Sequence, residues 1–357
     1  LSECLGISIL LAIVGVAGYA NGQPAISFQV QPFELKQVRL LESPFQQAME
    51  RDRRYLHELD LDRLLHNFRV NAGLPSTAEP LGGWEKPDCE VRGHTVGHYL
   101  TACALMVAST GDEELKTKVL TLVSELAKCQ KALGENGYLS AFPESFIDRV
   151  EACKPVWAPY YTLHKILNGL LDVYLECGSE QALDVATRMA AWFKMRSDRL
   201  LREQMQTILQ NTEQGGMNDA LTKLFSITGN PDHLALARTF DEDFYTEPLS
   251  RREDRLKGQH VNSFIPNMIG SAREYEMIGD ETARDIASFF WDQVTGHRCY
   301  ATGGTSNFES WRTDPDVLAE ELSPDTQETC CQYNMLKLTR HLFTWNPDPK
   351  YADYYER

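Results

Sequence analysis

Two residues that can share a metal ion stand two positions apart in the C-terminal part of the chain. Glu328 and Cys330 lie in the stretch Gln-Glu-Thr-Cys-Cys-Gln-Tyr-Asn, before a helical pattern that runs to Phe343. We expect Asp325 or Thr326 to cap this helix, which places both side chains in its first turn, where the helix dipole favours carboxylate and thiolate. One oxygen and one sulfur ligand suit zinc. A capping Glu beside a buried Cys explains the same spacing, so both interpretations stay open.

A carboxylate that can act as a general acid precedes this pair. Glu309 lies between Phe308 and Trp311, in a loop that begins with Gly303 and Gly304. A carboxyl group held against aromatic rings resists ionisation and can protonate a leaving group. We expect Trp311 to contact the substrate in the same pocket. A solvated loop Glu without a catalytic role remains the common alternative.

His94 and His98 open another helical stretch, Arg-Gly-His-Thr-Val-Gly-His-Tyr. Their i, i+4 spacing puts both rings on one helix face and is also a metal-ligand spacing. The Glu of the zincin motif is absent, because Thr95 follows the first His. We therefore favour histidines that hydrogen-bond a substrate over a metal pair, and a satisfied role in the core stays open.

An aromatic stretch opens a further helix, with Trp157, Tyr160 and His164 in Trp-Ala-Pro-Tyr-Tyr-Thr-Leu-His. Sugar rings pack their apolar faces on such side chains, while polar groups fix their orientation. We expect these three residues to contact substrate, although aromatic core packing explains the pattern equally well. His260 begins one more helix and adds a polar group to the same end of the molecule.

The elements that must position these residues are helices. Apolar residues follow the helical period nearly throughout, and only residues 24–42 suit one or two short strands. Trp345–Asp348 marks one sharp break between helices. Four other breaks carry a Gly that can form a left-handed C-cap, followed at once by a residue that can cap the next helix. They are Gly111-Asp112, Gly178-Ser179, Gly229-Asn230 and Gly279-Asp280.

These glycines recur at intervals of 67, 51 and 50 residues. A two-helix hairpin at that interval predicts an all-α fold of the (α/α)6-barrel type, since open α-solenoids usually have shorter repeats of about 34–47 residues. The long connections 74–92, 132–157 and 296–327 would then meet at one end and wall a pocket. We expect the barrel to be incomplete at its C-terminus, because Tyr351–Arg357 still has the pattern of a running helix.

Composition limits the partners. The chain has 357 residues, 43% of them hydrophobic, which is enough for a substantial core, and a net charge of −16. An acidic surface repels phosphates, so we expect no nucleic-acid partner, whereas neutral sugars remain open. Nine cysteines are present, and sequence alone does not determine which of them pair.

The N-terminus has the pattern of a truncated secretory signal peptide over residues 1–20. Residues 5–20 are almost wholly apolar but too short for a comfortable membrane span, and small residues precede Asn21. We therefore expect a secreted or periplasmic protein with no stable membrane span, and a catalytic domain over residues 21–357. An uncleaved anchor is the alternative.

Taken together, seven ordered stretches resemble glycoside hydrolase family 127 and its near relative, family 146. They are RGHTVGHYL (92–100), GYLSAFP (137–143), VWAPYYTLHKIL (156–167), EQGGMNDAL (213–221), HVNSFIP (260–266), ATGGTSNFESW (301–311) and QETCCQYNMLKLTRHLF (327–343). The resemblance implies an (α/α)6 barrel followed by β-sandwich domains, which we expect this chain to lack. It also implies retaining hydrolysis of β-L-arabinofuranosides in arabinose-containing glycans by a cysteine nucleophile held by zinc.

The same resemblance implies roles for single residues. Glu328 and Cys330 match two of four zinc ligands, Glu309 matches the general acid/base, and His260 matches a substrate-contacting His. The family's paired cysteines, one of them the nucleophile, stand well downstream of Glu-Thr-Cys, so we take Cys331 as an incidental neighbour and expect this chain alone to be inactive. Relatives often have Gly at the position of Phe308.

Two other functions remain as alternatives. Another α/α-barrel carbohydrate enzyme, such as an unsaturated-uronide hydrolase or a sugar epimerase, would need no zinc thiolate. A glycan-binding protein that keeps the fold would bind sugar without turnover, because fold does not fix function.

Overall fold

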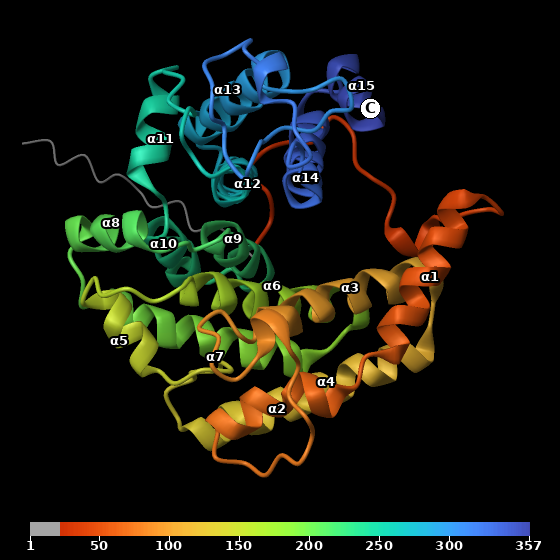
Figure 1. The fold of residues 1–357 in the computed structure, drawn as a ribbon, viewed down its shortest axis with the longest axis vertical. Coiled ribbons are helices and arrows are strands. Elements are labelled where there is room, and N and C mark those ends of the chain that lie inside the picture. Colours follow the sequence, from red (N-terminus) through yellow and green to blue (C-terminus); the bar gives the residue numbers. More distant parts are fainter. Residues whose placement is uncertain (1–21) are drawn as a thin grey trace, which may run out of the picture.

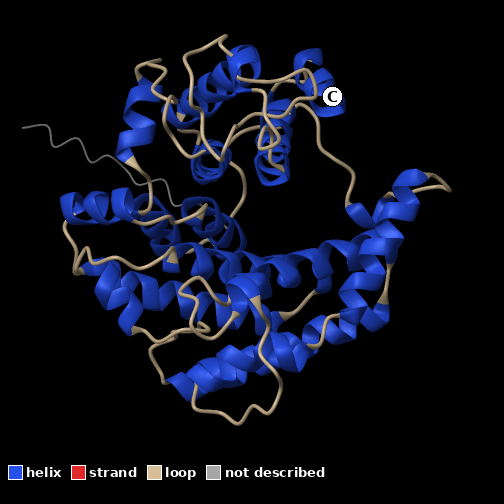
Figure 2. Cartoon of the chain, in the orientation of Figure 1, coloured by secondary structure: helices blue, strands red, loops and turns tan. Residues whose placement is uncertain are grey.

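The computed structural model describes residues 22–357, so the signal peptide expected over residues 1–20 lies outside the described residues. The described part is built from helices and loops (Figure 2). Its helices are α1 (Pro44–Glu58), α2 (Leu61–Asn71), α3 (His94–Thr110), α4 (Glu113–Leu133), α5 (Ser145–Glu151), α6 (Pro159–Cys177), α7 (Glu180–Ser197), α8 (Arg202–Asn211), α9 (Met217–Thr228), α10 (Pro231–Thr239), α11 (Asp243–Ser250), α12 (Val261–Ile278), α13 (Glu281–His297), α14 (Thr329–Trp345) and α15 (Pro349–Glu356), with short 3-10 turns η1 (Leu35–Gln37), η2 (Gly83–Glu85) and η3 (Ala319–Glu321).

The expectation of strands in residues 24–42 is wrong. Within residues 22–357 only isolated β-bridges occur, and none of them lies in this segment. The chain there runs along helix ends instead, where the Ala25 and Gln29 amides donate to the carbonyls of Glu276 and Thr344. These carbonyls belong to α12 and α14, so the extended segment satisfies its backbone on helices and needs no partner strand.

The four predicted glycine turns are confirmed. Gly111, Gly178, Gly229 and Gly279 end their helices with φ of 75°, 72°, 66° and 72°. The side chain of the next residue in each turn then accepts a hydrogen bond from an amide of the following helix. A single left-handed residue thus joins two helices, which forces the second helix to return beside the first.

Five hairpins follow one another around the molecule, four joined by these glycine turns and the fifth, α14 and α15, by the connection 346–348 (Figure 1). The first helices, α3, α6, α9, α12 and α14, each pack against the next, while α4, α7, α10, α13 and α15 pack outside them. This is the architecture of an α/α barrel, as predicted. The core lies between the two layers and forms two large apolar clusters, one from α1 to α10 and one from α11 to α15. Within the described residues, no helix has the length and apolarity needed to cross a bilayer.

Charged side chains tie neighbouring hairpins together. The buried Asp219 of α9 accepts from Arg273 of α12 at 2.5 Å and lies 3.9 Å from Lys337 of α14. The buried Glu276 of α12 binds the ring of His341 of α14 at 2.7 Å. Burial alone would raise the pKa of Asp219, but the charges of Arg273 and Lys337 outweigh it and lower that pKa below its usual range.

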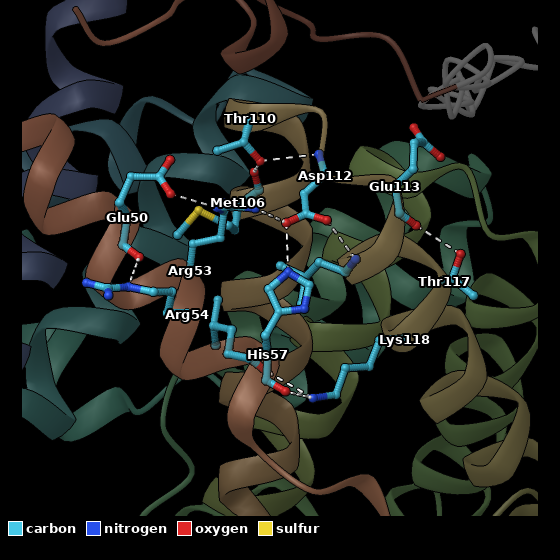
Figure 3. A network of polar contacts seen from close by, with 12 residues as sticks. Glu50, Arg53, Arg54, His57, Met106, Thr110, Asp112, Glu113, Thr117 and Lys118 are labelled. Carbon is cyan, nitrogen blue, oxygen red and sulfur yellow. Dashed lines mark hydrogen bonds and ion pairs between the residues drawn. The ribbon is translucent and has the colours of Figure 1, made fainter. Parts of the chain in front are cut away.

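A polar network holds α1 on the turn between α3 and α4 (Figure 3). Asp112, which caps α4, also accepts from Arg53 Nη1 at 2.7 Å and contacts His57 Nε2 at 2.8 Å. Lys118 of α4 donates to the carbonyl of His57 and to those of two neighbours at the end of α1. A lysine at the last carbonyls of a helix satisfies groups that have no partner within that helix.

Two glycines allow α3 and α6, two of the inner helices, to pack closely against each other. A Cβ atom on Gly97 of α3 would lie 2.1 Å from the backbone carbon of Lys165 in α6, and one on Gly169 would lie 2.5 Å from the Gly97 carbonyl oxygen. The obstacles are backbone atoms, which cannot move away as the end of a side chain can. The α3–α6 crossing therefore depends on the absence of a side chain at both positions.

We expect Gly97→Ala to lower the free energy of unfolding by about 1–3 kcal/mol, because the new methyl group forces α3 and α6 apart. Gly296→Ala in α13 is the matched control, since a Cβ there meets no atom within 4 Å and its backbone is not left-handed. That change should leave stability unchanged or raise it by up to about 1 kcal/mol. Urea unfolding followed by circular dichroism measures both. Equal stability of the two variants would contradict the close contact.

Candidate active site

The loop that carries Glu309 is fixed between the starts of two inner helices. On one side the Val261 amide of α12 donates to the Glu309 carbonyl at 2.8 Å. On the other side the Phe308 amide donates to the Asp325 carbonyl, just before α14, at 3.2 Å. Backbone hydrogen bonds between loops thus hold the candidate acid beside the start of α14, which carries the candidate metal ligands.

This loop has an unusual backbone. Ser306, Phe308 and Glu309 have φ of 101°, 45° and 65°, and Gln327 has φ of 70°. Residues with a Cβ atom rarely adopt these values, and the strain is commonly stored at functional sites. The φ of Phe308 is left-handed, a conformation that glycine adopts more readily than a residue with a Cβ atom. The loop is strained in the stretch that aims the Glu309 side chain.

Glu309 faces His260 across the loop. Their Oε2 and Nε2 atoms lie 3.9 Å apart. His260 caps α12, and its Nδ1 accepts from the Ser263 amide at 3.1 Å. That hydrogen bond requires Nδ1 to lack a proton, so in the neutral ring Nε2 carries it and points towards Glu309. The Glu309 side chain is 67% exposed, so it is open to a ligand and is not enclosed by aromatic rings as the sequence predicted.

Two residues predicted to contact substrate lie in the core instead. Trp311 is 4% exposed, packs on Phe264, and donates its indole N–H to Thr305 Oγ1 at 2.8 Å. Tyr160 is 3% exposed and packs edge to face on Phe240. Both side chains are buried in the core under the loops. The structure therefore corrects the expectation that Trp311 and Tyr160 contact substrate directly.

Tyr161 occupies the place that was expected for its neighbour. Its hydroxyl lies 3.2 Å from His98 Nε2, and its ring centroid lies 6.0 Å from that of His94. Burial and the charges of Glu213 and Cys330 raise the pKa of the Tyr161 hydroxyl. The two predicted histidines and Tyr161 thus form one polar cluster at the starts of α3 and α6.

Glu85, which sequence reasoning missed, orients His94. The carboxylate of this buried Glu accepts from the amides of Gly93 and Thr95 at 2.6 and 2.9 Å and lies 2.9 Å from His94 Nδ1. The Val91 carbonyl also lies 2.9 Å from Nδ1, so this nitrogen carries the proton and leaves Nε2 free. The carboxylate also sits at the N-terminus of α3, which the helix dipole favours.

His164 lies below the loop surface. It is 6% exposed, and its Nδ1 accepts from the Gly216 amide at 3.3 Å. A Cβ atom on Gly215 would lie 2.6 Å from the same nitrogen, so the glycine pair is packed directly on the ring. Burial holds the pKa of His164 well below its usual range, which keeps the ring neutral and able to accept this bond. The geometry gives His164 the role of positioning the 213–216 loop.

Glu328, Cys330 and Cys331 form the potential metal site of the described residues. One ligand atom from each lies within 4.8 Å of the others. The structure corrects the helix start: Glu328 itself is the N-cap residue of α14, because Thr326 uses its hydroxyl to bond the Glu321 carbonyl. Cys331, taken as an incidental neighbour, is buried with its Sγ 3.6 Å from Glu328 Oε2.

The two thiols differ in acidity. The pKa of Cys330 is lowered, first because Cys331 donates a hydrogen bond to it, and the pKa of Cys331 is raised in return. Two sulfurs and a carboxylate match the ligand types that zinc prefers. The eight cysteines of the described residues are all free thiols, so no disulfide competes for this pair.

Comparison with known proteins identifies the framework. The model of the β-L-arabinofuranosidase, glycoside hydrolase family 127 catalytic domain matches residues 37–357. The chain belongs to glycoside hydrolase family 127. It is 24% identical over 298 residues to the non-reducing end β-L-arabinofuranosidase of Bifidobacterium longum subsp. longum, a match that covers 72% of this chain and 44% of that protein. The family 127 chain therefore spans less than half the length of that curated relative.

Solved structures show the same fold. A family 127 β-arabinofuranosidase superposes with a TM-score of 0.64 at 16% identity, over 92% of this chain and 54% of the other. A family 127 β-L-arabinofuranosidase from Geobacillus stearothermophilus T6 superposes with a TM-score of 0.56 at 20% identity, over 88% of this chain and 51% of the other. The α/α-barrel prediction is thus supported by family and by fold.

The Glu85 network of this family 127 domain predicts a pH-dependent stability. Burial alone would raise the pKa of Glu85, but His94 and the two amides outweigh it and lower that pKa. The stabilisation is therefore present above the unfolded-state pKa of about 4.3 and is lost as the pH falls through the lower folded-state value. At pH 7 we expect Glu85→Gln to lower the free energy of unfolding by about 1.5–3 kcal/mol.

The difference between wild type and Glu85→Gln should shrink as the protein is acidified below pH 4. Urea unfolding at a series of pH values measures it. Glu79→Gln serves as the control, because Glu79 is exposed in the same connection, and this change should have little effect at any pH. A Glu85→Gln difference that stays constant with pH would show that the carboxylate charge is not what holds the start of α3.

Proposed function

We propose that this chain forms the catalytic barrel of a retaining glycoside hydrolase that releases L-arabinose from β-L-arabinofuranosides. The main support is that the loop that carries Glu309 lies between His260 and the start of α14 and is held there by backbone hydrogen bonds on both sides. Family membership favours this function over an epimerase, an unsaturated-uronide hydrolase or a glycan-binding protein. The acidic chain favours a neutral glycan as the substrate.

Zinc is the metal that fits the donor set. We propose that Glu328 and Cys330 are ligands, because their atoms converge with those of Cys331 and a carboxylate with thiolates is a zinc-type set. Bound zinc keeps a cysteine thiol ionised near neutral pH, as a nucleophile requires. The nucleophile that the family resemblance implies is one of two paired cysteines, and Cys330-Cys331, which opens a helix, does not match that pair.

The remaining chemistry belongs to side chains of this chain. Glu309, open to the ligand, donates a proton to the leaving oxygen as the cysteine attacks the anomeric carbon. In the second step the Glu309 carboxylate takes a proton from the water that releases the sugar. His260 presents an N–H towards Glu309, with its Nε2 3.9 Å from Oε2. His94 and His98, with Tyr161, supply polar groups that orient the sugar hydroxyls.

Zinc affinity tests the ligand assignment. Glu328→Ala and Cys330→Ser should each weaken zinc binding by at least about tenfold, because each removes an atom that binds the ion directly. Competition with a chromogenic chelator gives the affinity, and elemental analysis gives the stoichiometry. Cys153→Ser is the control, since Cys153 is an exposed thiol on the α5–α6 connection and should not matter. Full zinc retention in both ligand variants would exclude the assignment.

Glu309→Ala tests the acid/base role in a zinc-loaded protein that carries the nucleophilic cysteine as well as this chain. Hydrolysis of natural glycosides should fall by about 10²–10⁴-fold, because their leaving oxygen needs a proton. An aryl β-L-arabinofuranoside with an acidic phenol needs little protonation, so its first step should survive better. Without the base for the second step, the pentose should accumulate on the protein, and intact-mass spectrometry would reveal the added mass.

Glu320→Ala is the control for this experiment, because Glu320 is an exposed carboxylate in the same long connection. This change should leave the rate of hydrolysis of both substrates unaffected. Equal losses of Glu309→Ala on natural and activated substrates, with no trapped pentose, would mean that Glu309 only shapes its loop.

A further inference from the structure

Trp84 and Trp157 are the two tryptophans that the fold leaves open to solvent. They are 63% and 47% exposed, whereas Trp192, Trp291 and Trp311 are 1%, 4% and 4% exposed. The two exposed rings meet edge to face with centroids 5.7 Å apart. Two adjoining large rings held at the surface leave a contiguous apolar area uncovered, and such areas commonly mark binding sites.

The hydrogen bonding of the indole N–H groups also distinguishes Trp84 and Trp157 from the other four tryptophans. Those of Trp84 and Trp157 meet no acceptor among the described residues, so each is free to donate to a ligand. The other four are satisfied within the protein: Trp192 donates to Glu144, Trp291 to Thr339, Trp311 to Thr305 and Trp345 to Glu276.

The backbone beneath each exposed ring is held by a carboxylate. Trp84 lies in the η2 turn next to Glu85, whose buried carboxylate accepts hydrogen bonds from amides at the start of α3. The Trp157 amide donates to Glu90 Oε2 at 2.9 Å, and Arg149 holds the other Glu90 oxygen at 3.0 Å. The rings are thus presented on fixed supports, which reduces the entropy lost when a ligand binds them.

The exposed pair stands at one end of a line of rings that leads to His94, Tyr161 and His98, the residues proposed to orient the sugar. The Trp84 centroid lies 6.0 Å from that of His94, and the His94 centroid lies 6.0 Å from that of Tyr161. The Tyr161 hydroxyl lies 3.2 Å from His98 Nε2, so the line of rings ends at the polar groups proposed to orient the sugar. A ligand that extends outward from these groups along the line reaches Trp84 and Trp157.

We propose that Trp84 and Trp157 form a distal platform for the neutral sugar to which the cleaved arabinofuranosyl residue is linked. A sugar ring offers an apolar C–H face to the indoles and hydroxyl oxygens to their free N–H groups. The net charge of −16 disfavours an anionic sugar. This inference rests on the proposed function, because it assigns the leaving-group side of the same site.

Isothermal titration calorimetry with two ligands tests the platform. All proteins carry Glu309→Ala, so that neither ligand is turned over. A β-L-arabinofuranosyl disaccharide should bind about tenfold more tightly than methyl β-L-arabinofuranoside, which lacks the second sugar. Trp84→Ala and Trp157→Ala should each lower the affinity for the disaccharide by about fivefold to tenfold and leave the affinity for the methyl glycoside unchanged. Trp84→Phe, which keeps a ring, should retain most of the affinity.

Phe45→Ala is the matched control, because Phe45 is a 77% exposed ring on α1, away from the site. It should change neither affinity. Absence of disaccharide binding, unchanged disaccharide affinity in both tryptophan variants, or equal weakening of both ligands would overturn the platform. L-Arabinose release is measured separately in a protein that keeps Glu309 and also carries the nucleophilic cysteine: its absence beside platform-dependent binding would count against the proposed reaction and not against the platform.

Discussion

The single-residue turns between helices are the constraint on which this architecture depends. At Gly111, Gly178, Gly229 and Gly279 one left-handed residue ends a helix, and the next residue caps its successor. No chain is left at that end of the hairpins to build a site. The connections at the opposite end are long, and the N-termini of α3, α6, α9, α12 and α14 meet there. Position in the hairpin repeat therefore decides which residues can do chemistry.

At the end of the barrel that carries the long loops, buried or half-buried carboxylates hold backbone and side-chain groups in place. Glu85 fixes the start of α3 and one tautomer of His94, and Glu90 fixes the amide of Trp157. The Glu309 loop is held by backbone hydrogen bonds to both sides while its own φ values are left-handed. Such a loop keeps its conformation only because its neighbours are rigid, so the barrel wall stabilises the strained geometry of the candidate acid.

Sequence patterns predicted the framework well because capping and periodicity are local properties. Glycine turns, hairpins and the family-specific stretches all follow from neighbouring residues. Tyr160 was predicted to contact substrate, but it is buried in the core, and its neighbour Tyr161 contacts His98 instead. Tyr161 begins a polar stripe that continues through Lys165, Asn168 and Asp172 at helical spacing, and this pattern was the signal available in the sequence.

Other errors have no local signal. Trp311 is close to Glu309 in sequence, yet it is drawn into the core by Phe264 and Phe290, which belong to two separate helices. The start of α14 was misplaced because the Thr326 hydroxyl bonds the carbonyl of Glu321, five residues earlier in the same loop. Competition of this kind for a side chain depends on the folded loop, and the role of Glu85 likewise depends on the folded structure.

The charged pairs across the inner layer make the hairpins dependent on one another. Asp219 of α9 needs Arg273 of α12 and Lys337 of α14, and Glu276 of α12 needs His341 of α14. Opening one hairpin leaves a partner charge buried and unpaired, a loss of about 3–5 kcal/mol for each pair broken. Solenoid repeats, which meet only their neighbours, can fray from one end. Here the ring resists such fraying, so its inner layer unfolds as a single cooperative unit.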